Sequence, residues 1–297
     1  MTNSEFKAAA KRHQINYRVK NISSEYKSYA TWLTDEAGQI GKNFFEGFSV
    51  IDAVRQRYPN FYVDLYSDML RSEHIPFNLF IPLRYDLTFC KNVFNEILGG
   101  CIKLIDKKTL IEGGENIKIE FAPTPKEYYL NDRTSFDTYL EYVHQDNTRG
   151  IIGIEVKYTE KEYRLEAGST QEKTINDKSS KYYSVSKDSR LYDPNSIDIL
   201  RTDIFRQIWR NQLLAESIRL FHNDKFKRSS SLIFYPEGNE HFTDTSERYM
   251  ALLLEKNNKF VPVTYEKFLS ACNNHCPSND FKRWIDYLTK RYIVLKG

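Results

Sequence analysis

The stretch Gly150-Ile-Ile-Gly-Ile-Glu-Val-Lys-Tyr158 decides the predicted fold of this chain. A short run of Ile and Val after a glycine is typical of a buried β-strand. Glu155 and Lys157 interrupt the run, and because side chains alternate along a strand, both point to the same face. Burying either charge costs on the order of several kcal/mol unless it is paired or binds a metal. The strand is therefore expected to carry a functional site.

A further acidic residue precedes this strand. Asp137 lies at the start of the strand-like segment Phe136-Asp-Thr-Tyr-Leu-Glu-Tyr-Val143. An Asp followed by Glu-x-Lys on the next strand suggests two carboxylates that hold a divalent metal beside a lysine. Mg²⁺ prefers such oxygen ligands and is commonly bound together with a substrate phosphate. The pattern indicates a metal-dependent nuclease.

The composition is that of a soluble globular protein. The chain has 297 residues, of which 40% are hydrophobic and 28% charged, and its net charge is only +3. This balance excludes a strongly basic nucleic-acid coat, so an acidic ligand must be bound by a local patch. The 21 Tyr and 19 Phe are expected mostly in the core, with some available to stack on bases.

The cysteines and the apolar segments favour a cytoplasmic location. Cys90, Cys101, Cys272 and Cys276 are scattered, which is not the pattern of a disulfide framework. The N-terminus has no apolar signal region, and no apolar run approaches the roughly 20 residues of a membrane span. We expect a cytoplasmic protein with no membrane partner.

Two regions are expected along the chain. Residues 1–75 are predicted as a helical N-terminal extension, and residues 76–297 as the domain that carries the site. Between them, Pro76 is expected to keep the polar segment 71–78 from continuing as a helix. A polar stretch at about 168–198 is predicted as a long insertion or loop.

Hydrophobic periodicity predicts the central elements in the order helix, strand, strand, strand, helix, strand. The predicted ranges are 86–99, 117–121, 136–143, 151–159, 203–221 and 230–236. Helices around 244–255, 264–272 and 279–291 follow. This order predicts an α/β domain.

With Asp137, Glu155 and Lys157 in place, the chain resembles the PD-(D/E)XK nuclease superfamily, in particular its restriction-endonuclease-like bacterial branch. Four further segments match: His74-Ile-Pro-Phe-Asn78, Lys157-Tyr-Thr-Glu160, Gln207-Ile-Trp-Arg-Asn-Gln-Leu-Leu-Ala215 and the helix Tyr287 to Tyr292. The resemblance covers most of residues 70–293. Phe136 stands where the family name has Pro, a minor departure. The resemblance implies an αβββαβ core, with a mixed central sheet flanked by helices.

The resemblance also implies the chemistry. Asp137, Glu155 and the backbone carbonyl of Val156 would bind Mg²⁺, for which Mn²⁺ could substitute. Lys157 would orient or help deprotonate the attacking water, and Gln207 would lie near the metal or the scissile strand. The implied activity is endonucleolytic hydrolysis of DNA phosphodiester bonds, leaving a 5′-phosphate. RNA as substrate is not excluded.

Other residues are weaker candidates. Glu73 could add an acidic ligand, Glu160 could support the site or form a salt bridge, and Arg210, with Gln212, suits either phosphate contacts or surface solvation. Gln207 itself could instead make a capping or core-edge hydrogen bond. The salt bridge of Glu160, the surface solvation of Arg210 and Gln212, and the hydrogen bond of Gln207 are ordinary structural roles.

The segment Cys272-Asn-Asn-His-Cys276 places three zinc-ligand types close together, including His275. A closed structural zinc site needs a fourth ligand, and no second cluster follows at ligand spacing. Ordinary loop residues are therefore the alternative.

The pattern leaves the biological setting open. Cleavage of foreign DNA in defence and DNA repair both fit. A different class of function is a catalytically silent nucleic-acid-binding module or scaffold that keeps the nuclease fold. The helical N-terminal region could pack on the core, or support a homodimer or a separate protein partner.

Overall fold

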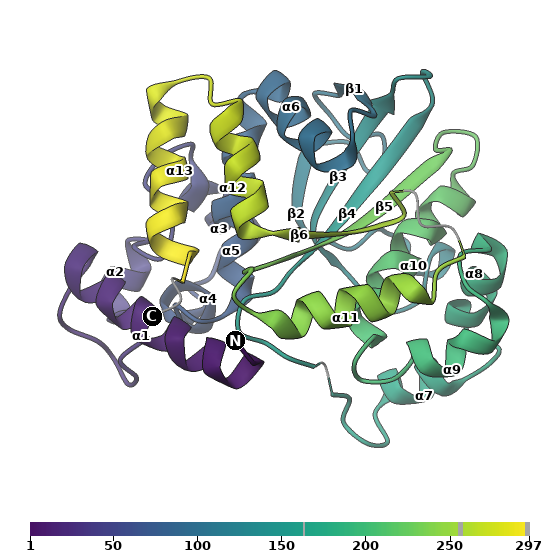
Figure 1. Ribbon diagram of the computed structural model, residues 1–297, viewed down its shortest axis with the longest axis horizontal. Helices are drawn as coiled ribbons and strands as arrows, with labels where there is room; N and C mark the ends of the chain where they lie inside the picture. Colours follow the sequence, from purple (N-terminus) through teal and green to yellow (C-terminus); the bar gives the residue numbers. More distant parts are fainter. Residues whose placement is uncertain (163, 255–257, 295–297) are drawn as a thin grey trace.

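The computed structural model describes residues 1–162, 164–254 and 258–294. Its centre is a mixed six-stranded sheet with helices on both faces (Figure 1). The strand order is β1-β3-β4-β5-β6, and β2 pairs with β3 beside β1. Strands β1 to β4 pair antiparallel, whereas β4, β5 and β6 run parallel. The predicted fold class is confirmed.

The strands have these bounds: β1 (Ile102–Ile105), β2 (Ile117–Phe121), β3 (Phe136–His144), β4 (Arg149–Val156), β5 (Arg228–Tyr235) and β6 (Phe260–Thr264). The two that periodicity did not predict, β1 and β6, are short and lie at the sheet's edges. Pro262 lies in β6, where an edge position tolerates its missing N–H.

The helices of the first half are α1 (Asn3–Asn21), α2 (Asp35–Gln39), α3 (Val50–Arg57), α4 (Val63–Ser67), η1 (Ser72–His74), α5 (Ile75–Phe80), η2 (Pro82–Tyr85), α6 (Leu87–Leu98) and η3 (Lys126–Tyr128). Those of the second half are α7 (Thr170–Asn176), α8 (Lys181–Ser189), η4 (Pro194–Ser196), α9 (Ile197–Leu200), α10 (Arg206–Phe221), α11 (Glu240–Ala251), α12 (Tyr265–Asn274) and α13 (Asn279–Tyr292). The predicted order around the centre is present as α6, β2, β3, β4, α10 and β5.

One expectation about local structure was wrong, and the structure adds detail to a second. Pro76 does not end a helix but lies in the first turn of α5, where its missing N–H has no intrahelical acceptor to lose. All six residues of α5 are buried. The polar stretch 168–198 is not a plain loop, because α7, α8 and part of α9 form there around buried Tyr182.

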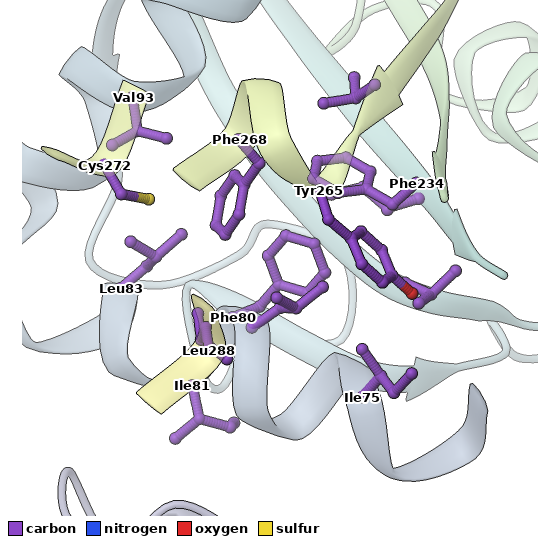
Figure 2. Packing of buried hydrophobic residues seen from close by; sticks show 14 of the residues in the cluster. Ile75, Phe80, Ile81, Leu83, Val93, Phe234, Tyr265, Phe268, Cys272 and Leu288 are labelled. Atoms are coloured by element: carbon purple, nitrogen blue, oxygen red, sulfur yellow. The ribbon is translucent and has the colours of Figure 1, made fainter. Parts of the chain in front are cut away.

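The alternation of side chains along β4 divides the core in two. Ile152, Ile154 and Val156 face one apolar cluster, and Ile151 faces the other. The first cluster lies between the sheet and α5, α6, α12 and α13. There the rings of Phe80, Phe234 and Phe268 pack against one another, with centroids 5.2 to 5.7 Å apart (Figure 2).

The second cluster lies between the sheet and α8, α10 and α11. Trp209 of α10 is fully buried in it and packs on Tyr182 of α8, with ring centroids 5.4 Å apart. Glu155 lies on the same face of β4 as Ile151, so its side chain points toward α10. The carboxylate therefore lies where polar side chains of that helix can reach it.

The N-terminal helices pack on the rest of the chain. Phe6 and Ala10 of α1 are fully buried in the first cluster. Gln14 donates hydrogen bonds to the hydroxyl of Tyr158 at 2.8 Å and to the carbonyl of Arg291 at 2.7 Å. Helix α1 is thereby joined to both the end of β4 and α13. Within the described residues, no helix has the length and apolar character to cross a membrane.

Candidate active site

Three acidic residues lie in one row across the sheet. The pairs Ile119–Thr138 and Phe121–Phe136 place Glu120 of β2 opposite Asp137 of β3. Thr138 pairs with Ile154, so in the antiparallel register the next pair along the strands is Asp137 and Glu155 of β4. The sheet register thus brings together two carboxylates that were predicted and one that was not.

Glu155 is held by three donors. The Lys157 ammonium lies 2.6 Å from Glu155 Oε1. The same oxygen accepts a hydrogen bond from the Gln207 amide, and Oε2 accepts one from the Asn211 amide. Gln207 and Asn211 are four residues apart on α10, so they lie on one face of the helix. The carboxylate is 5% exposed, and its charge is balanced by these contacts.

Asp137 accepts a hydrogen bond from the Val156 backbone N–H at 2.6 Å. Burial raises the pKa of Asp137 well above its usual value, and the nearby charges of Glu155 and Glu120 raise it further. Lys157 and the Val156 N–H only partly oppose this shift. Asp137 therefore lies where negative charge is in excess.

Glu120 is the acidic residue that the sequence reasoning missed. Its backbone has φ +53°, a left-handed conformation that is unusual for a non-glycine residue within a strand. Burial raises the pKa of Glu120 to about 7, with the charges of Glu155 and Glu73 adding to the shift. The alternation in Ile117-Lys-Ile-Glu-Phe121 was a usable signal, because it places Glu120 off the apolar face.

Lys157 directly follows the last residue of β4, and its backbone still pairs with β5. Its N–H donates to the Phe234 carbonyl at 2.7 Å, and its carbonyl accepts from the Tyr265 hydroxyl at 2.6 Å. Burial alone would lower the pKa of the ammonium, but Glu155, Asp137 and Glu160 outweigh it and the pKa is raised. Lys157 is therefore a fixed cation at neutral pH.

The donor atoms suit a hard divalent cation. Asp137, Glu155 and Glu120 occupy neighbouring positions on β3, β4 and β2, and the Asn211 amide oxygen is buried without a hydrogen-bond partner. Excess carboxylate charge and an unpaired buried oxygen are both features that a bound cation with its waters would satisfy. In the described residues, however, no three Asp, Glu, His or Cys side chains are already arranged around a single metal position.

The site opens into a cleft of about 750 Å³. Asp137, Glu155, Gln207 and Asn211 form its floor, together with Arg210 of α10. Its remaining walls come from the β2–β3 connection and from α7: Lys126, Asn131, Asp132, Arg133, Thr134, Ser135, Thr170, Gln171 and Thr174. The polar stretch 168–198 thus contributes directly to the cleft.

The weaker candidates have different surroundings. Glu73 contacts Arg71 at 2.8 Å and lies close enough to Glu120 to raise the pKa of that carboxyl. Glu160 accepts hydrogen bonds from the backbone N–H groups of Ser72 at 3.0 Å and Tyr158 at 2.8 Å. The first of these bonds joins the segment before α5 to the chain after β4.

Arg210 is 8% exposed and belongs to a buried network. It donates to Thr134 at 2.6 Å and to the Tyr182 hydroxyl at 2.8 Å, and it pairs with Asp132 at 3.1 Å. These contacts connect α8, α10 and the β2–β3 connection at the wall of the cleft. Gln212 is buried and accepts from the Tyr249 hydroxyl at 2.6 Å, so its suggested phosphate contact was wrong.

The proposed zinc residues do not form a cluster. Cys272 is fully buried in the first apolar cluster, and His275 pairs with Glu96 at 2.9 Å. Since the part of the chain that the structure describes holds no metal-ligating group of three such side chains, the structure gives no support for zinc.

Comparison with protein families gives one match. A model of the PD-(D/E)XK nuclease superfamily matches residues 1–294, which includes the N-terminal helices as well as the sheet. Neither a curated protein nor a solved structure matches the chain.

Proposed function

The chain belongs to the PD-(D/E)XK nuclease superfamily, and from this premise we propose that it is a Mg²⁺-dependent endonuclease that hydrolyses DNA phosphodiester bonds. Family membership indicates a nuclease, and nucleases of this superfamily generally use divalent metal ions. The observation that carries the proposal is the contact of Glu155 with both Lys157 and Gln207 beside Asp137. Asp137, Glu155 and Gln207 line one cleft.

Asp137 and Glu155 are the proposed metal ligands, with the carbonyl of Val156 as a third. When bound there, Mg²⁺ would lower the pKa of a bound water and neutralise charge on the phosphate. Gln207 and Asn211 fix the Glu155 carboxylate from the α10 side, and the Val156 N–H fixes that of Asp137. The ligands are therefore oriented by the protein before substrate arrives.

Lys157 is proposed to act as a cation rather than as a base. Its pKa is raised by the surrounding carboxylates, so it keeps its proton at neutral pH. An ammonium held at 2.6 Å from Glu155 can donate a hydrogen bond to the attacking water and stabilise charge that develops on the phosphate oxygens. Of the two roles considered for this lysine, this charge state favours orientation and electrostatic stabilisation.

The assignment of Lys157 is tested by Lys157→Ala, with Lys161→Ala as control. Lys161 is also close to the end of β4, but its side chain is 55% exposed and pairs only loosely with Glu162, at 3.4 Å. We expect the first variant to lose at least about 100-fold in cleavage rate and the second to match wild type. Equal cleavage by wild type and Lys157→Ala would show the assignment to be wrong.

Defence against foreign DNA and DNA repair both remain compatible with this proposal. A defence nuclease would depend on target sequence or modification, whereas a repair nuclease would prefer branched or damaged DNA. If purified protein binds DNA but does not cleave it with any divalent metal, the binding module becomes the better account.

A further inference from the structure

The β2–β3 connection carries an unusual combination of side chains beside the cleft. Lys126 and Arg133 are exposed at the cleft wall, and neither forms an ion pair with another described residue. Between them, Tyr128 is 51% exposed. Cations with no acidic partner next to an exposed aromatic ring are the side chains that bind a polynucleotide backbone and its bases.

Tyr128 does not stand alone on the surface. Its ring stacks on Phe221 at the end of α10, with centroids 4.7 Å apart and planes 17° apart. Phe221 is 48% exposed, and its ring packs edge-on against Tyr129. The two partly exposed rings thus form a stacked pair, the aromatic platform, and Tyr129 contacts its Phe221 ring edge-on.

The platform lies at a defined distance from the catalytic groups. Gln207 and Phe221 are fourteen residues apart on α10, which at about 1.5 Å per residue is about 21 Å along the helix. The segment 126–133 spans the same interval on the neighbouring wall, since Arg133 lines the cleft and Tyr128 contacts Phe221. The two cations at the cleft wall and the aromatic platform therefore lie on the same segment, 126–133, which contacts the end of α10 through Tyr128.

We propose that residues 126–133 together with Phe221 form a binding strip for a single polynucleotide strand that leads into the cleft. The inference rests on the proposed nuclease function and specifies its substrate class. Stacking on Tyr128 needs a base that is not stacked between neighbours inside a duplex, because the faces of those bases are covered. The preferred substrate is accordingly nucleic acid with unpaired bases beside the scissile bond: a single strand, or a duplex with a single-stranded tail.

The opposite wall agrees with a single strand. Helix α7 places Thr170 and Thr174, one turn apart, on the cleft. Hydroxyl groups such as that of Thr170 contact phosphate and sugar oxygens, whereas the Thr174 hydroxyl donates to the Thr170 carbonyl at 2.9 Å. A cleft of about 750 Å³ is in the size range of pockets that hold a small molecule, which fits a short piece of one strand.

Binding of labelled oligonucleotides tests the strip. Fluorescence anisotropy would be measured with the full chain in EDTA, which prevents metal-dependent hydrolysis, on a single strand, a blunt duplex and a tailed duplex. We expect wild type to bind the single strand and the tailed duplex more tightly than the blunt duplex. Tyr128→Ala should weaken single-strand binding about 5- to 100-fold, and Tyr128→Phe should restore it, since a phenyl ring still stacks.

A double variant of the strip and two control variants separate the strip from general surface effects. Lys126→Ala with Arg133→Ala should reduce the slope of log K against log salt by about 1.4, because each phosphate that is no longer neutralised accounts for about 0.7. Lys7→Ala with Lys11→Ala on α1 removes the same charge from exposed positions outside the cleft. Tyr29→Ala removes another ring, 64% exposed, that packs edge-on against Trp32. These two controls should leave binding unchanged.

The outcomes distinguish this inference from the function on which it rests. Equal affinity for blunt duplex and single strand, unchanged in Tyr128→Ala, would overturn the strip even if wild type cleaves DNA with Mg²⁺. Binding of the single strand that depends on Tyr128, without cleavage under any metal condition, would support the strip and refute the nuclease. Cleavage of tailed DNA that falls in Tyr128→Ala but not in Tyr29→Ala would support both.

Discussion

At the scale of single residues, the three carboxylates of the site differ in how far their negative charge is compensated. Glu155 is neutralised by Lys157 and by two amide donors, whereas Asp137 and Glu120 face each other and Glu155 with less compensation. This imbalance explains why both of their pKa values are raised. The protein therefore orients the Glu155 carboxylate with three donors, and leaves Asp137 and Glu120 with excess negative charge around them.

Asn211 is expected to matter for metal binding although it is not a proposed ligand. Asn211→Ala removes the donor to Glu155 Oε2 and should weaken Mn²⁺ binding about 10- to 100-fold, as measured by isothermal titration calorimetry. Asn274→Ala is the matched control. It removes an exposed amide that donates a 2.9 Å hydrogen bond to Glu96 outside the cleft. An unchanged Mn²⁺ affinity in Asn211→Ala would contradict this role.

Glu120 is expected to make stability depend on pH. Its pKa in the folded protein is about 7, above its ordinary value of 4.5, so its contribution to stability is present below pH 4.5 and is lost as the pH rises through 7. In EDTA, Glu120→Gln should therefore gain stability relative to wild type between pH 5 and pH 8, on the order of 1 to 2 kcal/mol after allowance for partial exposure. Urea unfolding at both pH values would measure it, and parallel pH profiles of the two proteins would count against the assignment.

At the scale of elements, the site is built where β3, β4 and α10 meet. The strand pattern of β4 and the position of Asp137 in β3 were predictable, because apolar alternation and a charged interruption are local features of the sequence. Helix α6 was predictable for the same reason, with Asp86 as its cap and Gly99 at its end. The contact between Asn211 and Glu155 was not, because it depends on how α10 crosses β4.

The difference between local sequence features and tertiary packing also explains the helices that the sequence did not predict. A proline within a polar-looking segment is read locally as a helix breaker, but burial of Phe77 and Phe80 against the sheet stabilises α5 around Pro76. In the stretch 168–198, the helices α7 and α8 form because Ile175 and Tyr182 reach the second apolar cluster. Neither packing partner is visible within a short window of sequence.

Gly153 on β4 is expected to position Asp137. A Cβ atom at this glycine would approach Cδ1 of fully buried Phe136 to 2.5 Å, and Phe136 immediately precedes Asp137. Gly153→Ala should cost about 1 to 3 kcal/mol in the free energy of unfolding, by overpacking, and should also weaken Mn²⁺ binding. Adding Phe136→Leu to the same chain should recover part of both losses, and no recovery would argue against this contact as the cause.

At the scale of the whole molecule, the sheet separates the first and second apolar clusters, which pack different sets of helices. The first cluster joins α1, α5, α6, α12 and α13 to one face and makes the N-terminal helices part of the fold. The second holds α8, α10 and α11 on the face where the cleft opens. The family match across residues 1–294 agrees with this integration. A homodimer or a protein partner at the N-terminal helices stays a prediction.

The most direct test of the account is cleavage of supercoiled plasmid, linear duplex and single-stranded DNA by wild type and Glu155→Ala, each with Mg²⁺, Mn²⁺ or EDTA. The account predicts that wild type nicks or cuts DNA with either metal and not in EDTA, and that Glu155→Ala does neither. Cleavage by Glu155→Ala at the wild-type rate, or by wild type in EDTA, would contradict it.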